Sequence, residues 1–311
     1  MSGAVEVWRG GVNTWECDEM GHLNVRHWVA KATEGLAGLA GELGMPDAFQ
    51  PTATATLLLR EHHIRFLREA KPGAPLHMLG SVTSATEDEA WLLLQLIHSN
   101  TDEPAGTFQV RVAHVSPDSG RPFPWPTRVR ARLAQLTAEP PSHARPRSLS
   151  LEPVEPAAAL DAAERLGLRS IGRGTIDGGQ VDVFGRMRAE QFIGRVSDGV
   201  AGLVRPIREA VERSLESGSP GRMGGAVLEY RMLYLAWPQA GDHVLLRSGL
   251  AGVDGRTQRL VHWMLDPVSG RAWGSAEAVA INMDLDARRA APISERVQAA
   301  LRPLVVPGLT L

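Results

Sequence analysis

The stretch that decides the fold reads Trp15-Glu16-Cys17-Asp18-Glu19-Met20-Gly21-His22-Leu23-Asn24-Val25-Arg26-His27-Trp28. It stands between an expected short strand and an expected helix, and it places a carboxylate, an imidazole and an amide close together. Gly21 permits a sharp turn, and Asn24 is a favourable residue with which to begin a helix. N–H groups at a helix start can hold an oxyanion, while a neighbouring carboxylate or imidazole can act as base or nucleophile. The pattern therefore predicts a site that hydrolyses an ester or a thioester.

The run from Asp18 to Asn24 resembles the Asp-x-x-Gly-His-Val-Asn-Asn signature of hotdog-fold acyl-CoA thioesterases of the 4-hydroxybenzoyl-CoA thioesterase type. The resemblance implies an α+β fold in which an antiparallel sheet wraps a long helix, with the signature between the first strand and that helix. It also implies that Asp18 is the general base or nucleophile, and that His22 and Asn24 are its orienting or polarising neighbours. Two positions depart from the family pattern: Val25 replaces the second Asn, and Trp28 replaces an expected Tyr.

Cys17 offers a rival mechanism, because Cys17, His22 and Asn24 are the residue types of a thiol nucleophile site. In a strand that enters the turn, however, Cys17 and Asp18 point to opposite faces. The sequence also contains no indication that the thiol is activated. We therefore expect Cys17 to be a small buried apolar residue.

Composition indicates a globular protein of two domains. The chain has 311 residues, of which 43% are hydrophobic and 22% charged, so it can build ample cores. A formal net charge of -2 argues against a nucleic-acid partner, and a single cysteine excludes an intrachain disulfide framework. No run approaches the roughly 20 apolar residues of a membrane span. We expect a cytoplasmic enzyme that requires neither a metal nor a cofactor.

A degenerate internal repeat organises the chain. Gly185 follows Gly21 by 164 residues, Gly241 follows Gly73 by 168, and Glu229 then matches Glu61. In each copy a helical stretch precedes four apolar, strand-like runs. These segments are expected at 25–43, 54–66, 76–82, 91–98 and 105–115, and again at 189–215, 226–235, 243–250, 258–265 and 272–282. This order predicts two hotdog folds in tandem, forming a pseudo-dimer within one chain and leaving further association of chains open.

Prolines between the copies indicate an extended connection. We therefore place hotdog domain 1 at 1–138, a Pro-rich linker at 139–165, hotdog domain 2 at 166–290 and a C-terminal tail at 291–311. Turn residues at 118–120 and 267–270 are expected to separate the last two strands of each copy.

The second copy has a degenerate motif. Asp182 and Gly185 remain, whereas Arg186 and Arg188 replace the histidine and the asparagine. Guanidinium groups stay charged and cannot act as bases, so no hydrolytic centre is expected there. Arg186 and Arg188 are candidates for binding the phosphates of coenzyme A or of a carrier-protein arm. The alternative is a local salt bridge to Asp182 or Glu190.

Glu61 is a further catalytic candidate. The chain also resembles plant acyl-carrier-protein thioesterases, which are tandem hotdogs in which a Glu beyond the Asp and His motif joins the site. Glu61 is the nearest positional counterpart. In those enzymes the complete motif lies in the second copy, whereas here it lies in the first, and the alternative for Glu61 is a solvated strand residue.

The sequence therefore predicts a thioesterase that hydrolyses an acyl thioester of coenzyme A or acyl carrier protein to free acid and thiol. The apolar walls of its acyl site are expected from Trp15, Met20, Leu23 and Trp28. Two alternatives remain open: a double-hotdog dehydratase or hydratase of 3-hydroxyacyl thioesters, and a non-catalytic acyl-thioester binding protein.

Overall fold

The computed structural model describes residues 3–214, 223–284 and 289–311, which fall into two compact units. Unit 1 comprises Met1–Pro146 and Gly178–Gly194, and unit 2 comprises Arg147–Asp177 and Arg195–Leu311. The segment with the degenerate motif is thus grouped with unit 1. The domain boundaries expected at 138, 165 and 290 remain predictions. Within the described ranges, no helix has both the length and the apolar character needed to cross a bilayer.

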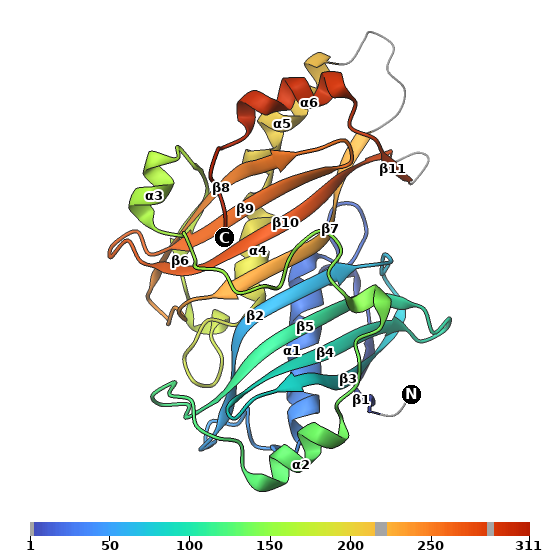
Figure 1. Ribbon diagram of the computed structural model, residues 1–311, viewed down its shortest axis with the longest axis vertical. Coiled ribbons are helices and arrows are strands. Elements are labelled where there is room, and N and C mark those ends of the chain that lie inside the picture. The colour runs from blue at the N-terminus through green and yellow to red at the C-terminus, as the bar shows by residue number, and fades with distance from the viewer. Residues whose placement is uncertain (1–2, 215–222, 285–288) are drawn as a thin grey trace. The chain divides into compact units, whose positions relative to one another are not determined.

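Unit 1 is an antiparallel sheet packed on a long helix. Its elements are β1 (Val5–Gly11), α1 (Val25–Glu42), β2 (Thr56–Phe66), β3 (Pro75–Ala85), β4 (Glu89–His98), β5 (Pro104–Val115) and α2 (Thr127–Gln135). The strands lie in the order β1-β3-β4-β5-β2. Figure 1 shows α1 running behind this sheet.

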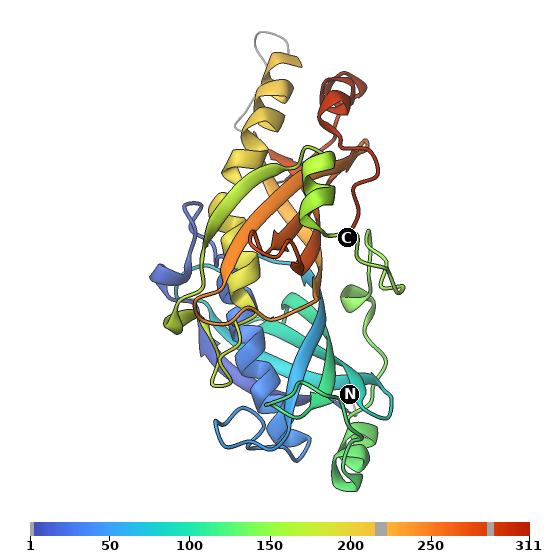
Figure 2. The same ribbon diagram turned by 90° about the vertical axis from the view of Figure 1, so that its left-hand side faces the viewer.

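Unit 2 repeats this plan. Its elements are α3 (Leu160–Arg165), β6 (Arg169–Thr175), α4 (Glu190–Gly199, its first residues counted with unit 1), α5 (Ala201–Ser214), β7 (Met223–Tyr234), β8 (His243–Val253), β9 (Thr257–Leu265), β10 (Ala272–Asp284), β11 (Arg289–Ala291) and α6 (Glu295–Leu301). The strand order is β7-β10-β9-β8-β6, and β11 pairs with β10. Figure 2 shows α5 on one side of this sheet and the C-terminal segment on the other.

The strand pairs of unit 1 and unit 2 have equivalent registers. Leu79 pairs with Gln95 between β3 and β4, and Arg247 pairs with Trp263 between β8 and β9, each residue 168 positions after its counterpart. The register shift within β2 recurs at the same offset within β7. Register determines which face each side chain occupies, so a constant offset through successive strands identifies a duplicated fold. The predicted repeat is therefore confirmed.

Helix α1 begins where the motif indicates. Asn24 has extended backbone angles, and its side-chain oxygen accepts a hydrogen bond from the N–H of Arg26 at 2.9 Å. Gly38 allows the helix to approach β1, because a Cβ at this position would collide with the carbonyl oxygen of Val7. Side chains at helical spacing form the buried apolar face: Trp28, Val29, Ala32, Leu36, Leu39 and Ala40.

The single helix expected over 189–215 is instead two helices. α4 ends at Gly199 and α5 begins at Ala201. Gly199 lies so close to the carbonyl oxygen of Ile171 that a Cβ there would collide with it. The expected end at Leu215 lies outside the described residues.

The Pro-rich segment is hydrogen-bonded along its length. Gln109 of β5 donates to the carbonyl of Ala144 at 2.8 Å within unit 1. Within unit 2, the carboxylate of Glu229 accepts from the N–H groups of Arg147 and Ser148 at 2.9 and 2.8 Å. The segment therefore lies against the protein on either side of position 146 and is not a solvated tether.

One turn expectation is wrong. Residues 266–271 connect β9 and β10 as expected, but Asp118–Gly120 follows β5 instead of preceding it. Residues 99–103 make the β4–β5 connection, where Asp102 has a φ of +54° and Gly270, 168 residues later, has a φ of +77°. Because Asp tolerates this left-handed conformation, the first copy needs no glycine there and has no obvious turn motif.

Candidate active site

The loop that carries Asp18 is closed by backbone hydrogen bonds in unit 1. The N–H of Asp18 donates to the carbonyl of His22, and the N–H of Asn24 donates to the carbonyl of Glu16, both at 2.8 Å. Gly21 has a φ of +75°, a conformation that glycine adopts without steric cost. The turn therefore brings Asp18, His22 and Asn24 together immediately before α1, as the sequence predicts.

The carboxylate of Asp18 has two unequal oxygens. Oδ1 accepts hydrogen bonds from the N–H groups of Met20 at 2.9 Å and His22 at 3.1 Å. Among the residues that the structure describes, no hydrogen bond reaches Oδ2. One oxygen thus shapes the turn, and the other is available to accept a proton or attack a carbonyl.

The degenerate loop has the same backbone and a different second oxygen. Oδ1 of Asp182 accepts from the N–H groups of Phe184 at 2.8 Å and Arg186 at 3.0 Å. Its Oδ2, however, lies 3.3 Å from Nε of Arg186, whose guanidinium also covers the ring of Phe184. The cation that replaces the histidine therefore neutralises the acid of the second motif.

Arg188 also makes local contacts. Its Nε lies 3.2 Å from Glu190, and its terminal nitrogen donates to the carbonyl of Gly179 at 2.6 Å. Arg186 and Arg188 thus both form the salt bridges that the sequence offers as the alternative to phosphate binding. Their assignment as substrate contacts stays a prediction.

His22 has a carboxylate partner that the motif does not contain. Nε2 of His22 lies 3.2 Å from Oε2 of Glu69, a residue of the loop that follows β2. The His22 side chain is 20% exposed and that of Glu69 is 37% exposed, so the pair is accessible from solvent. A backbone bond from the N–H of Leu23 to the carbonyl of Ala70, 2.8 Å long, holds the two loops together.

Asn24 is committed to the helix start. Its side-chain oxygen caps the N–H of Arg26, and its carbonyl accepts from the N–H of His27 at 2.8 Å. The first N–H groups of a helix lack partners within the helix. Asn24 engages two of them and leaves that of Val25, at the first helical position, as the candidate oxyanion donor.

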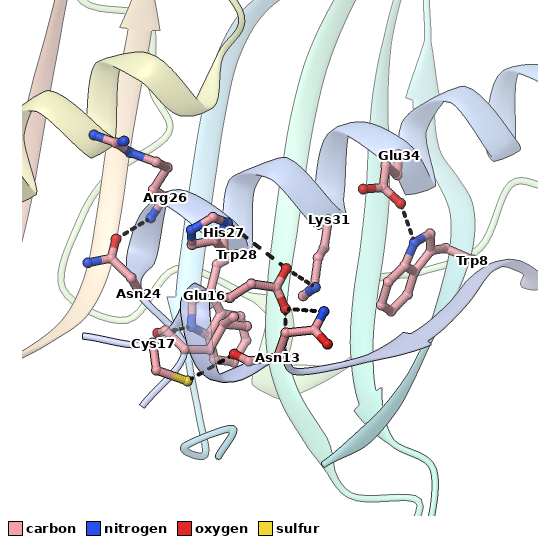
Figure 3. Close-up of polar contacts among 11 residues, drawn as sticks. Trp8, Asn13, Glu16, Cys17, Asn24, Arg26, His27, Trp28, Lys31 and Glu34 are labelled. Atoms are coloured by element: carbon pink, nitrogen blue, oxygen red, sulfur yellow. Dashed lines mark hydrogen bonds and ion pairs between the residues drawn. The ribbon is translucent and has the colours of Figure 1, made fainter. Parts of the chain in front are cut away.

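A buried ion pair ties the loop to α1 (Figure 3). Nζ of Lys31 lies 2.7 Å from Oε1 of Glu16, and the other oxygen of Glu16 accepts from the N–H of Asn13 at 2.7 Å. The ammonium also lies 5.3 Å from the centroid of the Trp8 ring. Glu16 is thereby fixed two residues before Asp18.

Glu16, and not His27, carries the charge next to Lys31. Burial raises the pKa of Glu16, but hydrogen bonds from Lys31 and Asn13 outweigh it, and the net pKa is lowered. Nδ1 of His27 lies 4.0 Å from Glu16, and burial lowers the pKa of this histidine despite the nearby carboxylate. At neutral pH, Glu16 is therefore ionised and His27 is uncharged.

Cys17 is not an activated thiol. Its Sγ donates to the carbonyl of Asn13 at 3.4 Å (Figure 3). Its pKa is raised by burial and by the charges of Asp18 and Glu16. A raised pKa disfavours the thiolate, which is the nucleophilic form. The thiol is thus not activated, as expected, but Cys17 is only partly buried and not the buried apolar residue that the sequence predicts.

The four residues expected to line the acyl site differ in exposure. Trp15 is 79% exposed and Met20 is 47% exposed, whereas Leu23 and Trp28 are each 4% exposed. The indole of Trp28 donates to the carbonyl of Leu23 at 2.9 Å, and its ring meets Phe66 edge-on. Only Leu23 and Trp28 therefore belong to a packed apolar wall. Substrate contact by any of the four stays a prediction.

Glu61 lies on β2 opposite Arg111 of β5 and is only 3% exposed. It is not the solvated strand residue offered as an alternative. Its catalytic role stays a prediction.

The motif alone does not identify Glu69 or the Glu16–Lys31 pair. Glu69 is 47 residues from His22 and follows a strand with no distinctive pattern. The position of Lys31 in the sequence does indicate a buried ion pair, because Lys31 lies on the apolar face of α1 with Trp28, Ala32 and Gly35. A cation in such a face requires a buried partner.

Family comparison agrees with this architecture. The model of the thioesterase-like superfamily matches residues 12–133 and 178–301, each match beginning near a motif loop. The chain belongs to the thioesterase-like superfamily, and the predictions of a tandem hotdog fold and of a thioester hydrolase are confirmed at the level of the family. No curated protein matches the sequence.

Solved structures with the same fold cover almost the whole chain. A candidate oleoyl thioesterase from Lactobacillus plantarum has a TM-score of 0.66 at 9% identity, covering 90% of this chain and 96% of its own. An acyl-ACP thioesterase from Bacteroides thetaiotaomicron has a TM-score of 0.62 at 11% identity, with coverages of 89% and 97%. The 12:0-ACP thioesterase from Umbellularia californica also has a TM-score of 0.62, at 9% identity, with coverages of 89% and 93%. At these identities the likeness establishes the fold alone.

Proposed function

We propose that the chain hydrolyses acyl thioesters of coenzyme A or acyl carrier protein at one site, built on the Asp18 loop. The contrast at the second carboxylate oxygen carries this proposal. Oδ2 of Asp18 has no hydrogen bond among the described residues, whereas Oδ2 of Asp182 is paired with Arg186 at 3.3 Å. Two of the similar structures are named as acyl-ACP thioesterases, which supports an acyl thioester as substrate.

In the proposed reaction, Oδ2 of Asp18 takes a proton from water as the water oxygen bonds to the thioester carbon. The N–H of Val25 and the positive end of α1 stabilise the oxyanion, and His22 orients the water or the carbonyl. The carbon–sulfur bond then breaks, and the departing thiolate receives the proton. The variant mechanism has Asp18 attack carbon directly and form an anhydride that water hydrolyses.

The test compares the two equivalent acids. Asp18→Asn should lower turnover of acyl-CoA substrates by at least about 100-fold, because the amide cannot accept the proton. Asp182→Asn is the matched control, with the same backbone contacts and an expected turnover close to wild type. Wild-type activity in Asp18→Asn would refute the assignment. Equal losses in the two variants would refute a single site.

The same assay separates the alternative functions. A thioesterase releases free thiol, a hydratase changes enoyl absorbance without releasing thiol, and a binding protein does neither. Titration with a tight substrate analogue should yield one site per chain. Cys17→Ser should leave turnover nearly unchanged.

A further inference from the structure

The contact between His22 and Glu69 joins the motif loop to the loop that follows β2. Asp18 and Asn24 are held by local bonds to their own turn, whereas the imidazole is held by a carboxylate from a separate loop, 3.2 Å away. An imidazole that donates one N–H to a carboxylate has a defined tautomer, and its other nitrogen becomes the acceptor. The contact therefore determines which nitrogen of His22 carries the proton.

The second copy has lost both members of this pair. Arg186 stands 164 residues after His22, and Trp237 stands 168 residues after Glu69, at the offsets of their respective segments. Trp237 stacks on Tyr234 at 4.8 Å, and Arg186 turns to Asp182. The carboxylate is thus absent from the copy that has no imidazole, which links the function of Glu69 to that of His22.

We propose that Glu69 is a positioning residue for His22: its carboxylate accepts a hydrogen bond from Nε2–H and so fixes the tautomer and the orientation of the ring. This inference rests on the proposed function of the Asp18 loop. Both side chains are partly exposed, and such pairs contribute little to stability. A kinetic loss in a Glu69 variant would therefore not reflect unfolding.

The first test is a double-mutant cycle. Glu69→Ala should lower kcat by about 10- to 100-fold, the cost of misplacing a catalytic group, with KM nearly unchanged. Glu69→Gln, which retains an acceptor oxygen, should recover part of the loss. In a His22→Asn background, Glu69→Ala should have no further effect. Independent, multiplicative effects of the two substitutions would overturn the proposal.

Glu103 provides the matched control. It forms a more exposed ion pair with Arg68, the residue next to Glu69, at 2.7 Å. Glu103→Gln should leave kcat unchanged. A loss equal to that of Glu69→Ala would show that the kinetic effect is a general consequence of removing charge near this loop.

The second test does not depend on activity. The ¹⁵N resonances of the His22 ring, assigned by their loss in His22→Asn, should report a single Nε2–H tautomer in the wild type and a mixture in Glu69→Ala. An unchanged tautomer in Glu69→Ala would overturn the proposal. Failure of the proposed function has a different signature, since Asp18→Asn would then remain active whatever the His22 spectrum shows.

Discussion

The ammonium group of Lys31 lies 2.7 Å from the carboxylate of Glu16, and these side chains are only 6% and 13% exposed. In the second copy the equivalent positions are Arg195 and Gln180, and Arg195 donates to the carbonyl of Thr175 at 3.0 Å. The motif loops of the two copies are closed by the same backbone bonds. At these two equivalent positions only the first copy has residues of opposite charge, and the first copy is the one that retains the histidine and the asparagine.

Removing one member of this pair should strongly destabilise the protein. Lys31→Met leaves a buried carboxylate without its counter-ion, and we expect a loss of about 3 kcal/mol or more in the free energy of unfolding, measured by urea denaturation. The double variant Glu16→Gln/Lys31→Met should recover much of this loss. Arg9→Met, which breaks an exposed ion pair with Glu6, is the control and should change the same free energy far less, because solvent screens exposed charges. A loss in Lys31→Met no larger than in Arg9→Met would contradict the prediction.

The Glu16–Lys31 contribution should also depend on pH. The pKa of Glu16 is lowered in the folded state, so the stabilisation is present above the ordinary glutamate pKa of about 4.3. It is lost as the pH falls through the folded value, where the carboxylate takes up a proton. The stability difference between wild type and Lys31→Met should therefore shrink in acid.

Two glycines of α1 should respond oppositely to alanine. Gly38→Ala places a methyl group against the carbonyl of Val7, and the resulting displacement of helix from strand should outweigh the gain in helix propensity of about 1 kcal/mol. At Gly41, an added Cβ would have no neighbour within 4 Å, so Gly41→Ala should stabilise the protein by about 0.5–1 kcal/mol. Thermal unfolding of the two variants tests this, and a shift of the same sign in both would disprove it.

Buried His262 should make unit 2 sensitive to acid. Its Nδ1 lies 2.8 Å from Oγ of Ser248, and burial lowers its pKa to about 4. Between pH 6.5 and 4 the unfolded chain binds a proton that the folded chain excludes. The free energy of unfolding therefore decreases as the pH decreases, by up to about 1.4 kcal/mol per pH unit. Ser248→Ala/His262→Leu should reduce this slope, and what remains includes the contribution of His62, whose pKa burial lowers to about 3. Leucine is the residue at the equivalent position of the first copy, Leu94. The same slope in urea denaturation of the variant would show that another group is responsible.

Arg186→Ala should not selectively weaken binding of coenzyme A. Because the guanidinium is paired with Asp182, its loss should change KM equally for coenzyme A esters and for short thioesters that lack the nucleotide. Steady-state kinetics on matched substrates measures the ratio. A KM increase confined to the coenzyme A ester would restore the phosphate-binding role.

Much of the fold could be predicted because its determinants are local. Gly21 and Gly185 have positive φ values in equivalent turns, and apolar runs separated by turn residues define the strands of both copies. The sequence prediction was wrong at the turn between β4 and β5 and in the helix expected over 189–215. Asp102 takes the left-handed position that Gly270 fills in the second copy, and the helix that apolar spacing predicts over 189–215 breaks between Gly199 and Ala201.

The candidate site was only partly predictable, because some of its contacts are local in sequence and others are not. Asp18, His22 and Asn24 lie on one turn, so their proximity follows from sequence spacing. Glu69 reaches His22 only because two loops are joined by backbone pairing, and no pattern in the sequence specifies that contact.

The sequence by itself determined the duplicated fold and the composition of the motif loop, since turn residues, capping and strand register act over a few positions along the chain. Tertiary structure alone decided which carboxylate oxygen is engaged, which acid holds His22 and which charge balances Lys31. Those outcomes depend on distances of about 3 Å between side chains from different elements and on their removal from water. Such distances and burial arise only when the helix and strands pack.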